Sequence, residues 1–209
     1  MDFRILAILI GYCIGLIQTA HIIGRVMGID IREHGSGNAG ATNALRVMGR
    51  KVGVTVLLAD VFKGVLAFVI CALIWNGGGT FSGDGSVLPG LYGAIGAILG
   101  HCFPFYMKFK GGKGFATTIG LMMALDFRMF LIVTCVGVII VLLTRYISLA
   151  TLVLALMMPI IIYLFGYPLE VVIATALVTA LVWFRHRANI TRLLKGEENK
   201  FSFKKKAVL

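Results

Sequence analysis

The sequence predicts an all-α integral membrane protein with seven transmembrane helices, its N-terminus outside and its C-terminus in the cytoplasm. Three observations predict this class: an extreme apolar composition, apolar runs of the length of a membrane span, and basic residues that gather on alternate loops. Of 209 residues, 59% are hydrophobic and only 14% are charged, with a mean hydropathy of +0.95. These values lie far outside the range of soluble domains. We expect one helical membrane domain over residues 1–209 with a short basic tail, about residues 186–209.

Seven apolar runs approach the roughly 20 residues that a helix needs to cross a bilayer. They cover residues 3–24, 52–75, 87–107, 113–126, 129–144, 147–166 and 168–184. The first run lacks a cleavage site made of small residues, so we expect a retained span and not a signal peptide. Three runs are short, and an alternative joins Phe115 to Leu143 into one span, which gives six spans in total.

The distribution of charge favours seven spans over six. With the N-terminus outside, the inside segments then hold every lysine and arginine except Arg4, Arg128 and Lys63. Six spans would place the C-terminal cations outside, against the bias of cytoplasmic loops towards Lys and Arg. The outer loop at residues 76–86 carries no Lys or Arg, and we interpret it as a flexible connection.

The net charge of +11 would indicate nucleic acid as the partner of a soluble protein. Here the cations lie in loops beside the membrane, where anionic lipid attracts them, so we predict membrane lipid as a partner and no nucleic acid. The cysteines lie in or at the edge of apolar runs without the spacing of a metal or redox site. We predict that Cys13, Cys71, Cys102 and Cys135 are buried thiols, with neither disulfide nor metal.

The first unusual polar stretch is HGSGNAGATN, residues 34–43, on the inside. Its glycines permit positive φ and the close approach of a ligand. Between Arg32 and Arg46 it also contains short side chains that can donate hydrogen bonds. If a helix begins near Thr42, its free amides and dipole favour an anion. The alternative is a flexible cytoplasmic turn. The glycines are Gly35, Gly37 and Gly40, and the donors are Ser36, Asn38, Thr42 and Asn43.

The second stretch is KGGKG, residues 110–114, directly before an apolar run. Consecutive glycine amides around Lys113 are typical of a nest that binds phosphate. The pattern is not a Walker A loop, because Gly114 follows Lys113 where that motif requires Ser or Thr. The alternative is a basic loop that anchors the protein at the membrane surface.

The third stretch begins at Arg185 and His186, at the end of the last apolar run. On a helix leaving the membrane, Arg185, Asn189 and Arg192 would share one side. His186 could act as a base, as an orienting partner or as an ordinary interfacial residue. Ser148 and Thr151 could add hydroxyls from another inside loop.

Asp60 and Lys63 lie within the second span at a spacing of three residues. An unpaired charge there costs about 2.5 to 3.5 kcal/mol on insertion scales, so we expect the two to pair. Their role is either a structural clasp or the positioning of the cytoplasmic loops. Taken together, the inside stretches predict a site for phosphate-bearing ligands beside hydrocarbon. A transporter of organic phosphates and a metal-dependent alcohol phosphotransferase are rival readings, but neither inverted repeats nor spaced aspartates support them.

Together the three stretches resemble the PlsY family of bacterial glycerol-3-phosphate acyltransferases. The resemblance rests on GSGNAGATN with Arg46, on GHCFPF running into KGGKG, and on RHRANITRLLKGEE. It implies seven spans, an active site at the cytoplasmic face of the plasma membrane, and transfer of an acyl group from acyl phosphate to the 1-position of glycerol 3-phosphate, with lysophosphatidate as product. None of the histidines begins the His-x-x-x-x-Asp pattern that is common in thioester-dependent acyltransferases.

We expect no cofactor and no metal, since the inside stretches contain almost no carboxylates and no metal ligands. Acyl phosphate carries a good leaving group, so the resemblance implies that the protein mainly has to neutralise phosphate, align both substrates and stabilise the oxyanion. Arg46 and Lys113 are the expected charge clamps, and His186 mainly orients substrate while a substrate phosphate could take the proton. The predicted catalytic residues are Ser36, Arg46, Lys113 and His186. The predicted substrate-binding residues are Gly37, Asn38, Gly40, Ala41, Thr42, Asn43, Lys110, Gly111, Gly112, Gly114, Arg185, Asn189 and Thr151.

Overall fold

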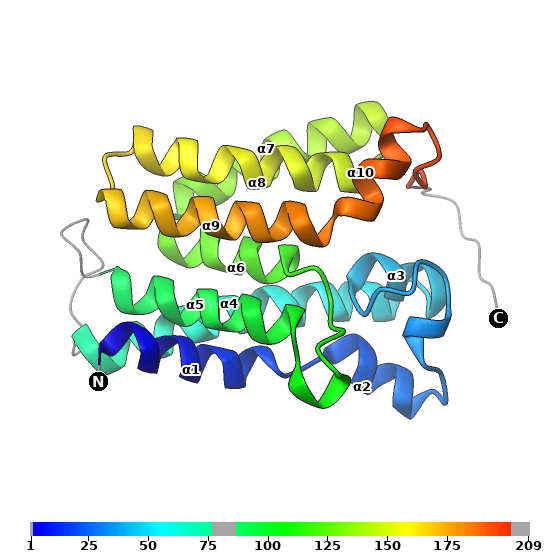
Figure 1. Cartoon of the computed structure of the whole chain (residues 1–209). Helices are drawn as coiled ribbons and strands as arrows, with labels where there is room; N and C mark the ends of the chain where they lie inside the picture. The colour runs from blue at the N-terminus through cyan, green and yellow to red at the C-terminus, as the bar shows by residue number, and fades with distance from the viewer. Residues whose placement is uncertain (1, 77–86, 202–209) are drawn as a thin grey trace.

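The structure, a computed structural model, describes residues 2–76 and 87–201 (Figure 1). Most of the predicted outer loop and the end of the basic tail lie outside these residues. Within them the chain is helical, with ten α-helices and two short 3-10 helices. In chain order these are α1 (Phe3–Gly15), α2 (Thr19–Val26), η1 (Ile31–Glu33), α3 (Ala41–Val47), α4 (Arg50–Asn76), α5 (Leu88–Cys102), η2 (Phe105–Met107), α6 (Phe115–Leu125), α7 (Phe127–Thr144), α8 (Ile147–Leu164), α9 (Leu169–Arg185) and α10 (Arg187–Leu194).

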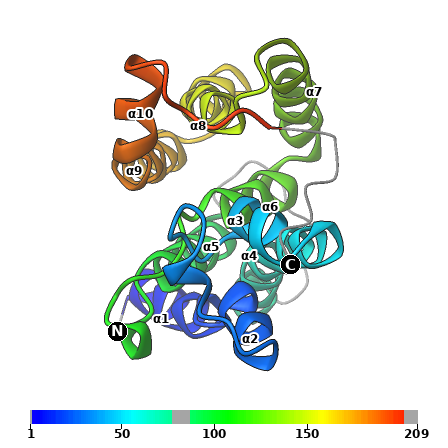
Figure 2. The same ribbon diagram turned by 90° about the vertical axis from the view of Figure 1, so that its right-hand side faces the viewer.

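The long helices lie side by side in a bundle with two parts. Viewed along the bundle, α1, α4, α5 and α6 form one part, and α7, α8 and α9 form the other (Figure 2). The apolar core between α4, α5, α6, α8 and α9 is filled by side chains such as Phe68, Leu91 and Met158. The pair α1 and α5 packs through glycine: a Cβ on Gly11 would lie 1.8 Å from the Gly93 carbonyl oxygen. Such small residues allow the close backbone approach that holds helices together in lipid.

The break between α6 and α7 excludes the alternative with one long helix over residues 115–143. Asp126 caps α7, because its carboxylate accepts from the Arg128 amide at 2.8 Å. Helix α6 begins near Asn189, which Lys113 contacts, and it ends near Tyr167, which donates to the Leu125 carbonyl at 3.2 Å. Helix α7 runs back towards the end of the bundle that holds Asn189. There the carbonyl of Arg145, which follows α7, accepts a hydrogen bond from the Phe201 amide. The two helices are therefore antiparallel.

Helix lengths support a protein that crosses a membrane. Five segments of the described chain are long and apolar enough for a span, namely residues 3–26, 50–75, 88–107, 127–144 and 147–164, and α9 with α10 forms a bent pair that would be a sixth. Helix α6 has only 11 residues. At 1.5 Å per residue it is about 17 Å long, roughly half of a hydrocarbon core.

The two ends of the bundle differ in character. At the end where α1 begins, Arg4 binds Glu170 at 2.7 Å and Tyr92 donates to the same carboxylate at 2.8 Å. The three unusual polar stretches all lie at the other end. All four cysteines are free thiols, but the prediction that all are buried is wrong for Cys13 and Cys135, which are exposed on the outside of the bundle.

Candidate functional site

Asn43 organises the first polar stretch. Its side-chain oxygen accepts from the Ser36 amide at 2.8 Å, and its side-chain nitrogen donates to the carbonyls of Ile31 at 3.1 Å and His34 at 3.0 Å. Asn43 is 1% exposed, and both ends of its amide are used within the loop. The structure therefore gives Asn43 the task of shaping the loop.

The glycines of this stretch have two different roles. Gly35 and Gly37 adopt the positive φ angles that were predicted, +61° and +69°. The prediction is wrong for Gly40, whose φ is −140° and which caps α3 in an extended conformation. Ala41 and Thr42 follow as the first residues of α3, where amides have no partner within the helix. Ser36 and Thr42 are both exposed.

The backbone of the glycine loop, residues 110–114, is bound by the side chain of an arginine. The guanidinium of Arg185 donates to the Gly112 carbonyl at 2.7 Å and to the Gly111 carbonyl at 3.0 Å. Its planar fork suits two acceptors at once, and it also lies over the Phe103 ring, 5.2 Å from the centroid. Arg185 thus fixes the loop through the backbone.

The amides of the glycine loop are only partly available to a ligand. The Gly111 amide donates to the Cys102 carbonyl at 3.2 Å, and the Gly112 amide donates to the His101 carbonyl at 3.0 Å. In this conformation both amides are therefore used within the backbone, and contact of Gly111 and Gly112 with substrate stays a prediction. Gly114, with a φ of +84°, turns the chain into α6, whose first turn has amides without a partner in the helix.

Lys113 lies at the centre of the site, where its ammonium donates to the side-chain oxygen of Asn189. Burial, together with the nearby cations Arg192, Arg185 and Arg46, lowers the pKa of Lys113 to about 8, although the Glu198 carboxylate opposes this shift. An ammonium that is short of counter-charge is prepared to receive an anion. The influence of Arg46 places the first and second polar stretches close to one another.

The third stretch reaches Lys113 through a bend. The chain turns by 62° between α9 and α10, so the predicted continuous helix leaving the membrane is wrong. The bend directs Asn189, which is 6% exposed, towards Lys113. Glu198 was missed by the sequence analysis; it accepts from the Asn189 amide at 2.9 Å and from Arg192 at 2.8 Å. The sequence feature that could have identified it is the pair Glu197 and Glu198 at the end of RHRANITRLLKGEE.

His186 occupies the bend itself and is 5% exposed. Its Nδ1 lies 2.8 Å from the Val182 carbonyl oxygen, which can only accept. Nδ1 therefore carries a proton, and in the neutral ring Nε2 is left as an acceptor. Burial and the neighbouring Lys113 lower the pKa of His186 to about 4, so the ring is neutral at physiological pH.

Beneath the glycine loop lies a buried charge cluster. Asp60 and Lys63 pair at 2.6 Å, as predicted, and are 2% and 3% exposed. The Lys63 ammonium also contacts the Ile17 carbonyl at 2.9 Å and His101 Nδ1 at 2.7 Å. Gln18 donates to the His101 carbonyl at 3.1 Å. Neither His101 nor Gln18 was singled out from the sequence, because each looks like an isolated polar residue in an apolar run.

The remaining predicted residues have no direct contact with Lys113 among those that the structure gives. Lys110 is exposed. Thr151 is buried at 4% exposure, and the buried Ser148 hydroxyl has no hydrogen-bond partner among the described residues. A side chain in that state is available to a ligand or to water. The structure therefore groups Lys113, Arg185, His186 and Asn189, with Arg46 at their edge, and leaves Ser36 on an exposed loop.

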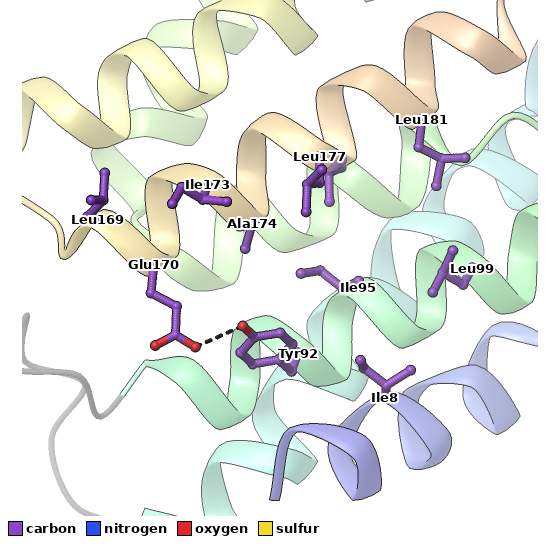
Figure 3. A pocket seen from close by; sticks show the side chains of 11 residues that line it. Ile8, Tyr92, Ile95, Leu99, Leu169, Glu170, Ile173, Ala174, Leu177 and Leu181 are labelled. Carbon is purple, nitrogen blue, oxygen red and sulfur yellow. Dashed lines mark hydrogen bonds between the residues drawn. The ribbon is translucent and has the colours of Figure 1, made fainter. Parts of the chain in front are cut away.

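An apolar groove begins beside this polar site. It has a volume of about 590 Å³ and lies between α9 on one side and α1 and α5 on the other. Figure 3 shows Leu99 and Leu181 at one end and Tyr92 with Glu170 at the other. Leu99 and Leu181 are close in sequence to His101 and Arg185, so this end of the groove adjoins the glycine loop. Along α9, from Leu181 to Glu170, the groove extends about 17 Å at 1.5 Å per residue.

Comparison with known proteins gives consistent results. Residues 5–196 match the family model described as glycerol-3-phosphate acyltransferase. A glycerol-3-phosphate acyltransferase of Halalkalibacterium halodurans is 40% identical over 98% of this chain and 98% of its own. That of Shouchella clausii is 41% identical over 96% and 97%, respectively. The crystal structure of PlsY (YgiH), an integral membrane glycerol 3-phosphate acyltransferase in its glycerol 3-phosphate form, superposes with a TM-score of 0.85 at 34% identity, covering 96% of both chains.

Proposed function

Because the chain belongs to the glycerol-3-phosphate acyltransferase family, we propose that it transfers a fatty acyl group from acyl phosphate to the 1-hydroxyl of glycerol 3-phosphate, forming lysophosphatidate. One observation carries the proposal: the long apolar groove ends at Leu99 and Leu181, close in sequence to His101 and Arg185, which both bind the glycine loop. A phosphate and a fatty chain can therefore be held by one site. The family supports the acceptor, while the donor rests on the chemistry of these residues.

The reaction needs positioning more than it needs a strong base. The glycerol hydroxyl attacks the acyl carbonyl carbon, a new ester C–O bond forms, and the bond between the carbonyl carbon and the phosphate oxygen breaks. Inorganic phosphate leaves with the electron pair. Lys113 and Arg46 are the proposed cations that neutralise the phosphates, and a hydrogen bond to a charged group contributes about 1.5 to 3 kcal/mol. Ser36, Gly37, Asn38 and the start of α3 are proposed to complete the site.

We assign His186 mainly an orienting role. Its neutral Nε2 can accept a hydrogen bond from the attacking hydroxyl, but a pKa of about 4 makes the ring a weak base. The proton then passes to a phosphate oxygen of a substrate. If the His186→Gln enzyme retained only the background kcat while it bound glycerol 3-phosphate normally, the ring would be the base and this assignment would fail.

The groove is the proposed position of the acyl chain. Its walls include Ile95, Leu177 and Leu181, and no charged side chain lies along it before Glu170. Leu177 is 66% exposed, so the groove opens sideways towards lipid. A donor dissolved in the bilayer could enter without passing through water.

The membrane topology completes the proposal. We propose that α6 crosses together with the glycine loop, so that the chain has seven spans with residue 2 outside and the site at the cytoplasmic face of the plasma membrane. The antiparallel course of α6 and α7 supports this arrangement. Single cysteines placed at Asp2 and at Ser36, in a chain whose own cysteines are replaced, should react with impermeant maleimide from opposite sides of the membrane. Labelling from the same side would refute the topology.

One assay tests the donor. Purified protein receives palmitoyl phosphate and glycerol 3-phosphate with a chelator and without any thioester, and lysophosphatidate should form. Activity with acyl-CoA alone would overturn the donor assignment. Transport of glycerol 3-phosphate into vesicles without acylation would favour the transporter instead.

A further inference from the structure

The ring of His101 is fixed in one protonation state by its neighbours. The Lys63 ammonium has three hydrogens, and it has three acceptors: Asp60 at 2.6 Å, the Ile17 carbonyl at 2.9 Å and His101 Nδ1 at 2.7 Å. An ammonium can only donate, so Nδ1 must be the unprotonated nitrogen. The imidazole is therefore neutral and carries its proton on Nε2.

That proton faces the glycine loop. A Cβ built on Gly112 would lie 2.0 Å from His101 Nε2, so the tip of the ring touches the backbone at the point where a side chain would begin. The His101 carbonyl holds the Gly112 amide at 3.0 Å, and Gln18 holds that carbonyl in turn. His101 is 3% exposed, and its Nε2 makes no hydrogen bond with any residue that the structure describes.

We propose that His101 donates its Nε2 hydrogen to a phosphate oxygen of the substrate seated at the glycine loop. This proposal depends on the proposed function in one respect, namely that the ligand at the glycine loop carries a phosphate group. A phosphate oxygen is a strong acceptor and would give the Nε2 hydrogen a partner when the substrate binds. The donor is neutral, so it adds a hydrogen bond to a site that already contains Lys113 and Arg185 without adding repulsion between cations.

Two substitutions separate this role from a purely structural one. In His101→Gln, the longer side chain brings an amide N–H to the position of Nε2 but offers Lys63 no acceptor at the position of Nδ1. In His101→Asn, the shorter side chain offers Lys63 an oxygen near the position of Nδ1 but has no donor that reaches the loop. A donor role predicts that Gln is the better replacement, and a role in supporting Lys63 predicts that Asn is better.

Binding is measured by calorimetry in detergent at pH 7, with glycerol 3-phosphate, palmitoyl phosphate and inorganic phosphate as separate ligands. For the ligand that His101 contacts, the Asn variant should bind roughly tenfold to a hundredfold more weakly than wild type, and the Gln variant within about threefold of it. The ligand that is affected identifies which substrate supplies the phosphate. The proposal is overturned if the Asn variant binds all three ligands normally, or as well as the Gln variant.

Nuclear magnetic resonance of ¹⁵N-labelled histidine gives a test that needs no variant. In the wild-type protein His101 should show a protonated Nε2 and an unprotonated Nδ1 between pH 6 and pH 8, and the Nε2 signal should move when a phosphate ligand binds. A proton on Nδ1 would contradict the proposal. Failure of the proposed function gives a different result, in which ligands bind as described but acyl phosphate yields no lysophosphatidate.

Discussion

Replacing Gly112 by alanine should inactivate the protein without unfolding it. The new Cβ would lie 2.0 Å from Nε2 and 2.7 Å from Cε1 of His101, whereas real Cβ contacts essentially never fall below 3.0 Å. Either the ring or the loop must therefore move by about 1 Å. The ring is held at Nδ1 by Lys63, so the loop moves and takes Lys113 with it. A misplacement of about 1 Å in a catalytic site can reduce the rate about a hundredfold.

The assay follows the steady-state rate of the proposed reaction, the formation of lysophosphatidate, with the unfolding temperature measured in parallel. We expect kcat/KM of Gly112→Ala to fall about a hundredfold. Gly166→Ala is the matched control: that glycine has a φ of +77° with open space around it, between α8 and α9. The control should lose about 1 kcal/mol of stability and keep its kcat/KM. If kcat/KM of Gly112→Ala stayed within about threefold of wild type, the inference that the His101 ring stays fixed and the loop moves would be refuted.

Three further predictions concern the charges around the loop. Arg185→Lys loses the fork that bridges two carbonyls, so kcat/KM should fall about tenfold, while Arg187→Lys should leave it unchanged. Lys63→Met leaves the buried Asp60 carboxylate without its cation, and the free energy of unfolding should fall by about 3 to 5 kcal/mol; adding Asp60→Asn should restore much of the loss. Because burial lowers the pKa of Lys113 to about 8, its charge is present below that pH and lost above it. The kcat/KM profile should fall above pH 8, and Lys113→Arg should move this fall to higher pH.

The gross fold could be predicted because apolar length and basic loops are local properties of a sequence. The border between α6 and α7 was recognised from charge alone, and the structure confirms it through the Asp126 cap. The bend at His186 was missed, because the sequence from Trp183 to Leu194 has good helical periodicity and no proline or glycine. Tertiary contacts of Asn189 with Lys113 and Glu198 favour the bend.

The candidate site was predicted as a set of residues but not as an arrangement. Arg185 and Asn43 looked like ligands for phosphate, since both are donors in polar stretches, yet the structure uses them on backbone carbonyls. Gly111 and Gly112 looked like amide donors, but their own amides are used. His101 could not be identified, because its proposed role depends on two contacts that the sequence does not show. Packing of α4 and α5 brings Lys63 to its ring, and the loop after α5 folds Gly112 back onto it.

The short α6 has a consequence for the stability of the reactants. Helix α6 is only about 17 Å long, so in the proposed topology its first turn, with Gly114 before it, lies within the roughly 30 Å of hydrocarbon and not at its surface. Acyl phosphate is an anhydride and is open to attack by water as well as by glycerol. With acyl phosphate as the proposed donor, a reaction centre at this depth would limit the supply of competing water, so that the bound alcohol consumes the activated carbonyl and hydrolysis is suppressed.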